Sequence, residues 1–63
     1  MAGTGGDVYF EFVVVGRQVK VTAIDAASGL EAVVLGPAAT PQSDLQRLAL
    51  RKLEMRRQRE GKV

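Results

Sequence analysis

Two short apolar runs, residues 8–15 and 18–24, constrain this chain most, because only Gly16 and Arg17 separate them. Both runs are rich in β-branched and aromatic residues, which favour β-strands. A two-residue loop with glycine first suits a type II′ turn, since glycine tolerates a positive φ at that position. The sequence therefore predicts a β-hairpin closed by Gly16-Arg17.

The register of this hairpin follows from its apolar residues. With the loop at Gly16-Arg17, Phe12 lies opposite Val21. Side chains alternate between the two faces of a strand, so the same register gathers one wholly apolar face. That face carries Phe10, Phe12, Val14, Val19, Val21 and Ala23. A slip by one residue would turn both phenylalanines to the mixed face, so we expect the register to be fixed.

A third strand is predicted at Leu30–Leu35, after a turn that begins at Asp25. Asp favours turns because its side chain bonds nearby backbone, and Gly29 suits the left-handed position that closes a longer loop. A four-residue loop, 26–29, sets Ala32 opposite Ala23 and extends the apolar face. A three-residue loop would place Glu31 on that face, so we favour four.

A helix is predicted for the last third of the chain. Thr40-Pro41 is a typical start, and Ser43 with Gln46 offers an alternative start with the capping-box spacing. The helix should end near Arg59, with Gly61 as its stop. One apolar stripe is formed by Leu45, Leu48, Ala49 and Leu53.

We therefore expect an α+β fold, a three-stranded antiparallel β-meander followed by one C-terminal helix packed on one sheet face. Residues 8–60 should form a single domain, between a disordered N-terminal lead, 1–7, and a flexible C-terminus, 61–63. Within the domain, Leu48 and Leu53 should pack on Phe10, Phe12 and Val21.

The second sheet face predicts self-association. It carries five aliphatic residues that the helix cannot cover, Val13, Val15, Ile24, Val33 and Leu35. A 63-residue chain is marginally stable alone, and this one has no cysteine for a disulfide. We expect a homodimer, through sheet faces in preference to strand edges. A terminal segment folded over this face would instead leave a monomer.

The residue types argue against catalysis. The chain has no histidine and no cysteine, which removes the commonest general base, the commonest zinc ligands and the thiolate nucleophile. Glu11 and Glu31 share the mixed face, but we interpret them as charges that keep a half-exposed surface hydrated. We predict no catalytic, metal or cofactor site, and no enzyme.

Charge is uneven along the chain. Residues 1–39 hold two basic against four acidic residues, net −2, whereas residues 40–63 hold seven against three, net +4. A candidate anion-binding run comprises Arg51, Lys52, Arg56, Arg57 and Arg59. The helix has no aromatic residue for base stacking, so a solvated helix end is favoured. Nucleic-acid binding by this helix is the alternative function.

Several of these patterns together resemble a family of short bacterial proteins of unknown function, associated with alphaproteobacteria. They are Phe10–Gly16, Val19–Asp25, Gly29, Gly36-Pro37 and Leu48–Leu53. The resemblance implies a small stand-alone cytoplasmic protein and no particular activity. The N-terminus lacks the pattern of a signal peptide, and no apolar run reaches the roughly 18 residues of a membrane span. The expected function is a self-associating interaction module with no membrane partner.

Overall fold

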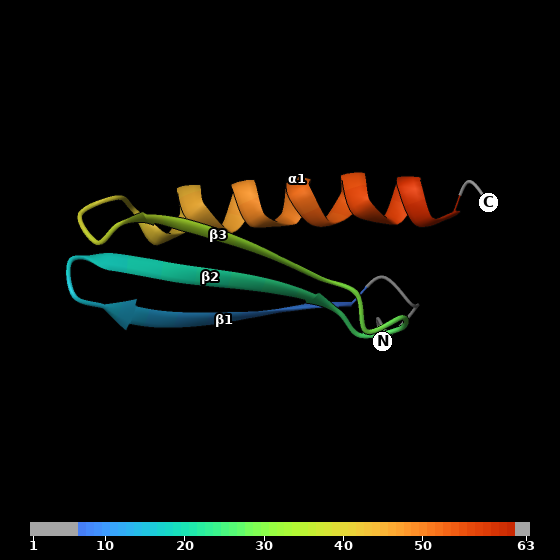
Figure 1. The fold of residues 1–63 in the computed structure, drawn as a ribbon, viewed down its shortest axis with the longest axis horizontal. Helices are drawn as coiled ribbons and strands as arrows, with labels where there is room; N and C mark the ends of the chain where they lie inside the picture. Colours follow the sequence, from blue (N-terminus) through green and yellow to red (C-terminus); the bar gives the residue numbers. More distant parts are fainter. Residues whose placement is uncertain (1–6, 62–63) are drawn as a thin grey trace.

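A computed structural model describes residues 7–61 of the chain. In this part, three antiparallel strands in the order β1-β2-β3 are followed by one helix, as the α+β prediction states. The bounds are Val8–Val15 for β1, Gln18–Asp25 for β2, Glu31–Pro37 for β3 and Gln42–Gly61 for α1. Figure 1 shows α1 running beside β3, with β1 farthest from it. The predictions for residues 1–6 and 62–63 lie outside the described residues.

The first hairpin has the predicted register. Phe12 pairs with Val21, and Val15 pairs with Gln18 at the end of the hairpin. Gly16 has a φ of 62°, whereas Arg17 is not among the residues with positive φ. Positive φ at the first loop position alone is the signature of a type II′ turn, so the glycine is there for the reason that the sequence indicated.

The second hairpin is closed by the predicted four-residue loop. Asp25 and Leu30 flank the loop, and the Asp25 amide donates a 2.8 Å hydrogen bond to the Leu30 carbonyl. Gly29, at φ 81°, takes the left-handed position and donates its amide to the Asp25 carbonyl. Ala23 consequently pairs with Ala32. The strand runs two residues beyond its predicted end, to Pro37.

The helix begins next to Pro41, whose carbonyl accepts hydrogen bonds from the amides of Asp44 and Leu45. Its first residue is Gln42, one residue after the predicted first helical position at Pro41, and Ser43, the alternative cap, lies inside the helix. At the other end α1 extends to Gly61, two residues past the predicted end. Differences of this size are ordinary at helix termini, where the hydrogen-bond ladder frays.

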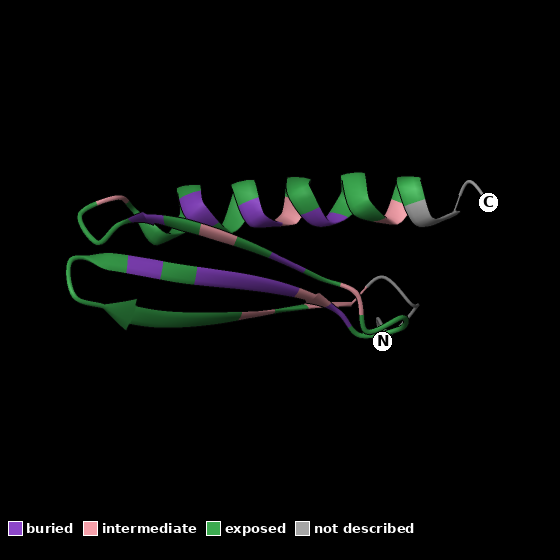
Figure 2. Cartoon of the chain, viewed as in Figure 1, coloured by how far each residue is buried: buried purple, intermediate pink, exposed green. Residues whose placement is uncertain are grey.

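The core lies between β2, β3 and one stripe of the helix. Its buried hydrophobic residues are Val19, Val21, Ala23, Ala32, Leu45, Ala49 and Leu53. Val8, Phe10, Leu30 and Val34 pack partly against them. Figure 2 shows that burial is concentrated on β2 and on the inner side of α1, while β1 is largely exposed.

The helix lies off the centre of the sheet, which corrects one prediction. Its contacts are mainly with β3 and β2. Leu53 is fully buried as predicted, but Leu48 is 53% exposed and Phe12 is 36% exposed. The predicted packing of Leu48 on Phe10, Phe12 and Val21 is therefore wrong.

Small residues explain this offset. Ala23, Ala32 and Gly36 leave room above β2 and β3, whereas β1 offers the bulky Phe10 and Phe12. A Cβ added at Gly36 would lie 2.5 Å from a methyl carbon of Leu45. The helix therefore approaches the sheet most closely where the side chains of the sheet are smallest.

No helix in the described residues is long and apolar enough to cross a bilayer.

Candidate interaction surface

The outer edge of β3 is covered by two basic side chains of α1. Lys52 Nζ donates a 2.7 Å hydrogen bond to the Val33 carbonyl, and Arg56 Nη1 donates one of 2.7 Å to the Glu31 carbonyl. Lys52 and Arg56 are four residues apart, so they lie on one flank of the helix. Leu48 is four residues before Lys52, so it belongs to the same outer flank, which explains its exposure.

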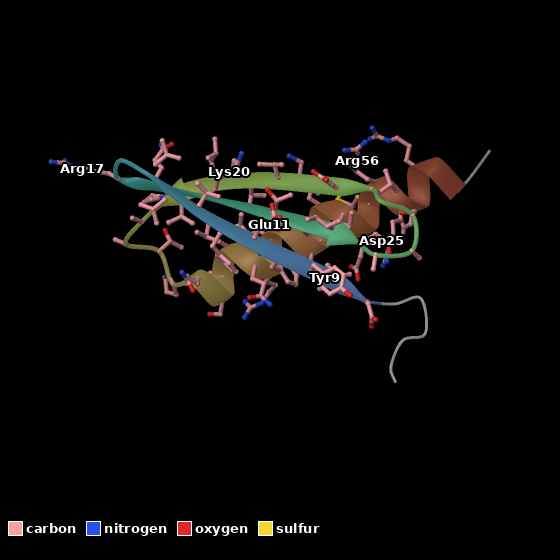
Figure 3. All side chains as sticks on the ribbon, turned by 90° about the horizontal axis from the view of Figure 1, so that it is seen from below. Tyr9, Glu11, Arg17, Lys20, Asp25 and Arg56 are labelled. Carbon is pink, nitrogen blue, oxygen red and sulfur yellow. The ribbon has the colours of Figure 1, made fainter. Side chains whose placement is uncertain are left out.

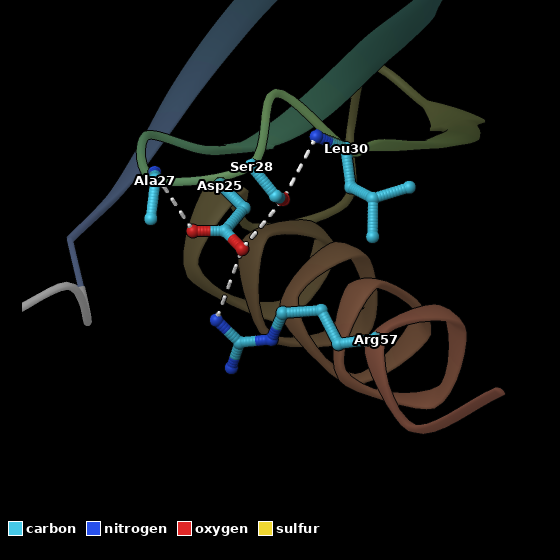
Figure 4. Close-up of polar contacts among 5 residues, drawn as sticks. All are labelled: Asp25, Ala27, Ser28, Leu30 and Arg57. Carbon is cyan, nitrogen blue, oxygen red and sulfur yellow. Dashed lines mark hydrogen bonds and ion pairs between the residues drawn. The ribbon is translucent and has the colours of Figure 1, made fainter. Parts of the chain in front are cut away.

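The loop after β2 is held by a buried carboxylate, Asp25 (Figure 4). The Ser28 hydroxyl donates 2.9 Å to Asp25 Oδ2, and the Ala27 amide donates 3.2 Å to Oδ1. Arg57 Nη1 of the helix lies 3.7 Å from Asp25 Oδ2. The Ser28 hydroxyl, followed by the Ala27 amide and the Arg57 guanidinium, lowers the pKa of Asp25 despite its burial.

These contacts divide the predicted anion-binding run. Lys52 and Arg56 are directed to the β3 edge, and Arg57 pairs with Asp25. Arg51 and Arg59 are exposed on the helix, and neither forms an ion pair with the acidic residues between Asp7 and Glu54. The run is therefore not one continuous basic stripe. The sequence predicted that Asp25 bonds the backbone of its turn, as the Ala27 amide shows, but it did not predict the contacts of Asp25 with Ser28 and Arg57.

The predicted self-association face is mostly open. Val13, Val15, Val33 and Leu35 are exposed. Ile24 is half-buried, and Thr22 between the outer strands is buried. Figure 3 looks onto this face, where Tyr9, Glu11 and Lys20 also lie while the helix is behind the sheet.

Strand β1 is the most exposed element of the sheet. Five of its eight residues are large hydrophobic side chains that remain exposed, Tyr9, Phe12, Val13, Val14 and Val15. They belong to both faces, because residues alternate along a strand. The uncovered apolar surface thus wraps around β1, and is broader than the single face that the sequence predicted.

The outer edge of β1 also has backbone groups to offer. The Ala26 amide donates a hydrogen bond to the Asp7 carbonyl. In an antiparallel pair the bonded residues alternate, so the backbone amides and carbonyls of the odd-numbered residues of β1 point toward β2. The amides and carbonyls of Val8, Phe10, Phe12 and Val14 therefore point outward. Within residues 7–61 no further strand lies against that edge.

The carboxylates do not form a reactive cluster in the described residues. Glu11 lies on β1 and Glu31 on β3, with β2 between them. No group of acidic side chains that could hold a metal ion occurs within residues 7–61.

Comparison with known proteins gives a family and no activity. A family model described as a domain of unknown function, DUF6898, matches residues 5–60. Neither the curated proteins nor the solved structures contain a significant match. The matched residues span nearly the whole chain, including all three strands and almost all of the helix. The chain therefore belongs to the DUF6898 family, whose members share a domain of unknown function.

Proposed function

We propose that this chain is a small, non-enzymatic interaction module that acts in the cytoplasm as a homodimer. The exposure of β1 carries the proposal, because five large hydrophobic residues of a single strand are accessible to solvent. Contiguous apolar surface of this kind marks protein interfaces in small domains. A second copy of the chain would remove this surface from water.

The size of the core supports the same proposal. Of the buried hydrophobic residues, Ala23, Ala32 and Ala49 contribute only a methyl group each, and Leu53 and Val21 are the largest that are fully buried. A domain of about 60 residues buries only roughly 60% of the surface that its unfolded chain exposes. Burial at a dimer interface would add to this small core.

The non-enzymatic part of the proposal is supported by the use of the charged residues. Asp25 is the buried carboxylate of the described residues; its hydrogen bonds hold the β2–β3 loop, and its ion pair with Arg57 connects this loop to the helix. Its lowered pKa keeps it ionised, which suits a structural anchor better than a general acid or base near neutral pH.

Sedimentation or light scattering over a range of micromolar concentrations tests self-association. A mass of twice 6.8 kDa is expected. A mass of 6.8 kDa throughout the range would overturn the homodimer.

Nucleic-acid binding is the second candidate function. The observation that favours it is that Lys52 and Arg56 bond to neutral carbonyls, so the helix keeps their positive charges. Titration with duplex DNA and RNA at two salt concentrations tests it. Binding should weaken with salt, with a slope of about 0.9 for each phosphate contacted in duplex DNA. Absence of binding at low salt would eliminate this candidate.

A further inference from the structure

We infer that two copies join edge to edge through β1, antiparallel, with Phe12 opposite Phe12 of the second copy. The inference rests on the self-association proposed above and specifies its geometry. The outward amides and carbonyls of Val8, Phe10, Phe12 and Val14 can pair with another strand, whereas an apolar ligand could not satisfy them. The result would be one continuous six-stranded sheet.

The other edge of the sheet does not offer the same opportunity. The carbonyls of Glu31 and Val33 already accept hydrogen bonds from Arg56 and Lys52. The strand also ends in Gly36-Pro37, and proline lacks the amide that a ladder needs. Basic side chains and proline are ordinary means of protecting an edge, and β1 has neither.

Charge selects the register. Glu11 is the single charged residue of β1. A two-fold axis at Glu11 would place two carboxylates directly opposite each other, which is destabilising. Moving the axis to Phe12 sets Glu11 opposite Val13 and Phe10 opposite Val14 of the second copy. All residues from Tyr9 to Val15 are then paired, and the two phenylalanines can form an aromatic pair.

A dimer interface of standard size would cover a substantial share of this small chain. A standard interface takes about 800 Å² from each partner. The chain has 4490 Å² of accessible surface, so roughly a fifth of it must be covered. Backbone pairing along β1, together with the side chains that flank it on both faces, uses the region that the helix leaves open (Figure 2).

Disulfide trapping tests the register, because the natural chain has no cysteine. In a hydrogen-bonded antiparallel pair the Cα atoms are about 5.5 Å apart, within the range that a disulfide spans. Phe12→Cys should therefore cross-link on oxidation about tenfold or more faster than the two comparison variants, since paired thiols have a millimolar effective concentration. Val13→Cys, which keeps Glu11, reports a neighbouring register with the two-fold axis at Val13, and Val33→Cys reports dimers formed through the sheet face.

The outcomes separate the inference from the function on which it rests. If the unmodified chain is monomeric, both the proposed homodimer and its edge-to-edge geometry are refuted. If it is dimeric and Phe12→Cys cross-links no faster than Val13→Cys and Val33→Cys, self-association stands and the Phe12-centred edge is overturned.

A lysine pair gives an independent test that retains Phe12. Val14 is 66% exposed and Leu35 is 61% exposed, so lysine at either site leaves the core intact. Val14→Lys should convert the dimer to a monomer, because it places a charge opposite Phe10 in the shared ladder. Leu35→Lys, on β3 and on the face away from the helix, should remain dimeric. A dimeric Val14→Lys, or a monomeric Leu35→Lys with the circular dichroism of a folded chain, would contradict the edge arrangement.

Discussion

Asp25 joins three parts of the fold through one carboxylate. It is the last residue of β2, its oxygens accept bonds from Ser28 and Ala27 in the following loop, and it lies against Arg57 of the helix. Ser28 is in turn fixed, because its hydroxyl accepts a 3.2 Å bond from the Leu30 amide. One residue therefore couples the second hairpin to the helix end.

This carboxylate should make part of the stability depend on pH. Because the pKa of Asp25 is lower in the folded chain than its ordinary value of about 3.9, the folded state favours the ionised form. Its contribution is present above that value and is lost as the pH falls through the lowered pKa. Thermal unfolding of Asp25→Asn should show a smaller loss of midpoint between pH 5 and pH 2 than the natural chain.

Asp44→Asn is the matched control for this pH effect. Asp44 is an exposed acid 3.9 Å from Arg47, in a pair that water screens strongly. Its unfolding midpoint should follow that of the natural chain across the same pH range. If the unfolding midpoint of Asp25→Asn also falls with pH as that of the natural chain does, ionisation of Asp25 does not contribute to the pH dependence of stability.

Gly16 should be needed for its backbone conformation alone. An added Cβ would meet nothing within 4 Å, so space does not limit the substitution. At φ 62°, however, a β-branched residue is strained, and Gly16→Val should lower the free energy of unfolding by about 1–3 kcal/mol. Arg17→Ala, in the same turn without positive φ, should change it by less than about 0.5 kcal/mol. Equal losses measured by urea denaturation would refute this explanation.

The helix is attached by a narrower stripe than its apolar residues suggest. Leu53 is fully buried and Leu48 is mostly exposed, although both are leucines on the same element. Leu53→Ala should therefore cost about 2–5 kcal/mol, and Leu48→Ala less than about 0.5 kcal/mol. Chemical denaturation measures both, and each variant controls for the loss of side-chain volume and helix propensity in the other. Comparable losses would place Leu48 in the core.

The sequence was sufficient for the sheet and insufficient for the placement of the helix. Register was predictable because the Gly16 turn and the alternation of apolar residues agree on a single pairing. Helical periodicity gave Leu48 and Leu53 equal weight. The different burial of the two leucines depends on the lateral position of α1 over the sheet. That position follows from the small residues Gly36 and Ala32, which let the helix approach β3, and from the hydrogen bonds of Lys52 and Arg56 to β3.

The interaction surface was predictable to a similar degree. Alternation predicted five accessible residues, of which Val13, Val15, Val33 and Leu35 are exposed, whereas Ile24 is half-buried. Alternation also placed Phe12 on the sheet face that the helix covers. On that face the helix covers mainly β2 and β3, so Phe12 on β1 stays partly exposed. A pattern along one strand cannot reveal which strands a helix leaves open, because that depends on residues distant in the sequence.

At the scale of the whole molecule, the two edges of the sheet are unequal. The helix runs beside β3 (Figure 1) and protects that strand with Lys52 and Arg56, whereas β1 remains exposed. A sheet with one protected edge can add one more sheet and then stops, because the second protected edges lie at the outside. The arrangement therefore favours a closed two-fold dimer over an open fibre.

Coupling between this dimer and folding should make stability depend on concentration. If the unfolded chain is monomeric and the folded chain pairs, a tenfold increase in concentration favours the folded dimer by about 1.4 kcal/mol, or about 0.7 kcal/mol per chain. For a domain of this size the unfolding midpoint should rise by roughly 3–6 °C. Val14→Lys, which removes the shared ladder, should melt at one temperature whatever its concentration, while Leu35→Lys keeps the dependence. Circular dichroism at two concentrations measures the unfolding midpoint of all three chains. If the midpoint of the natural chain is the same at both concentrations, its folding is not coupled to association.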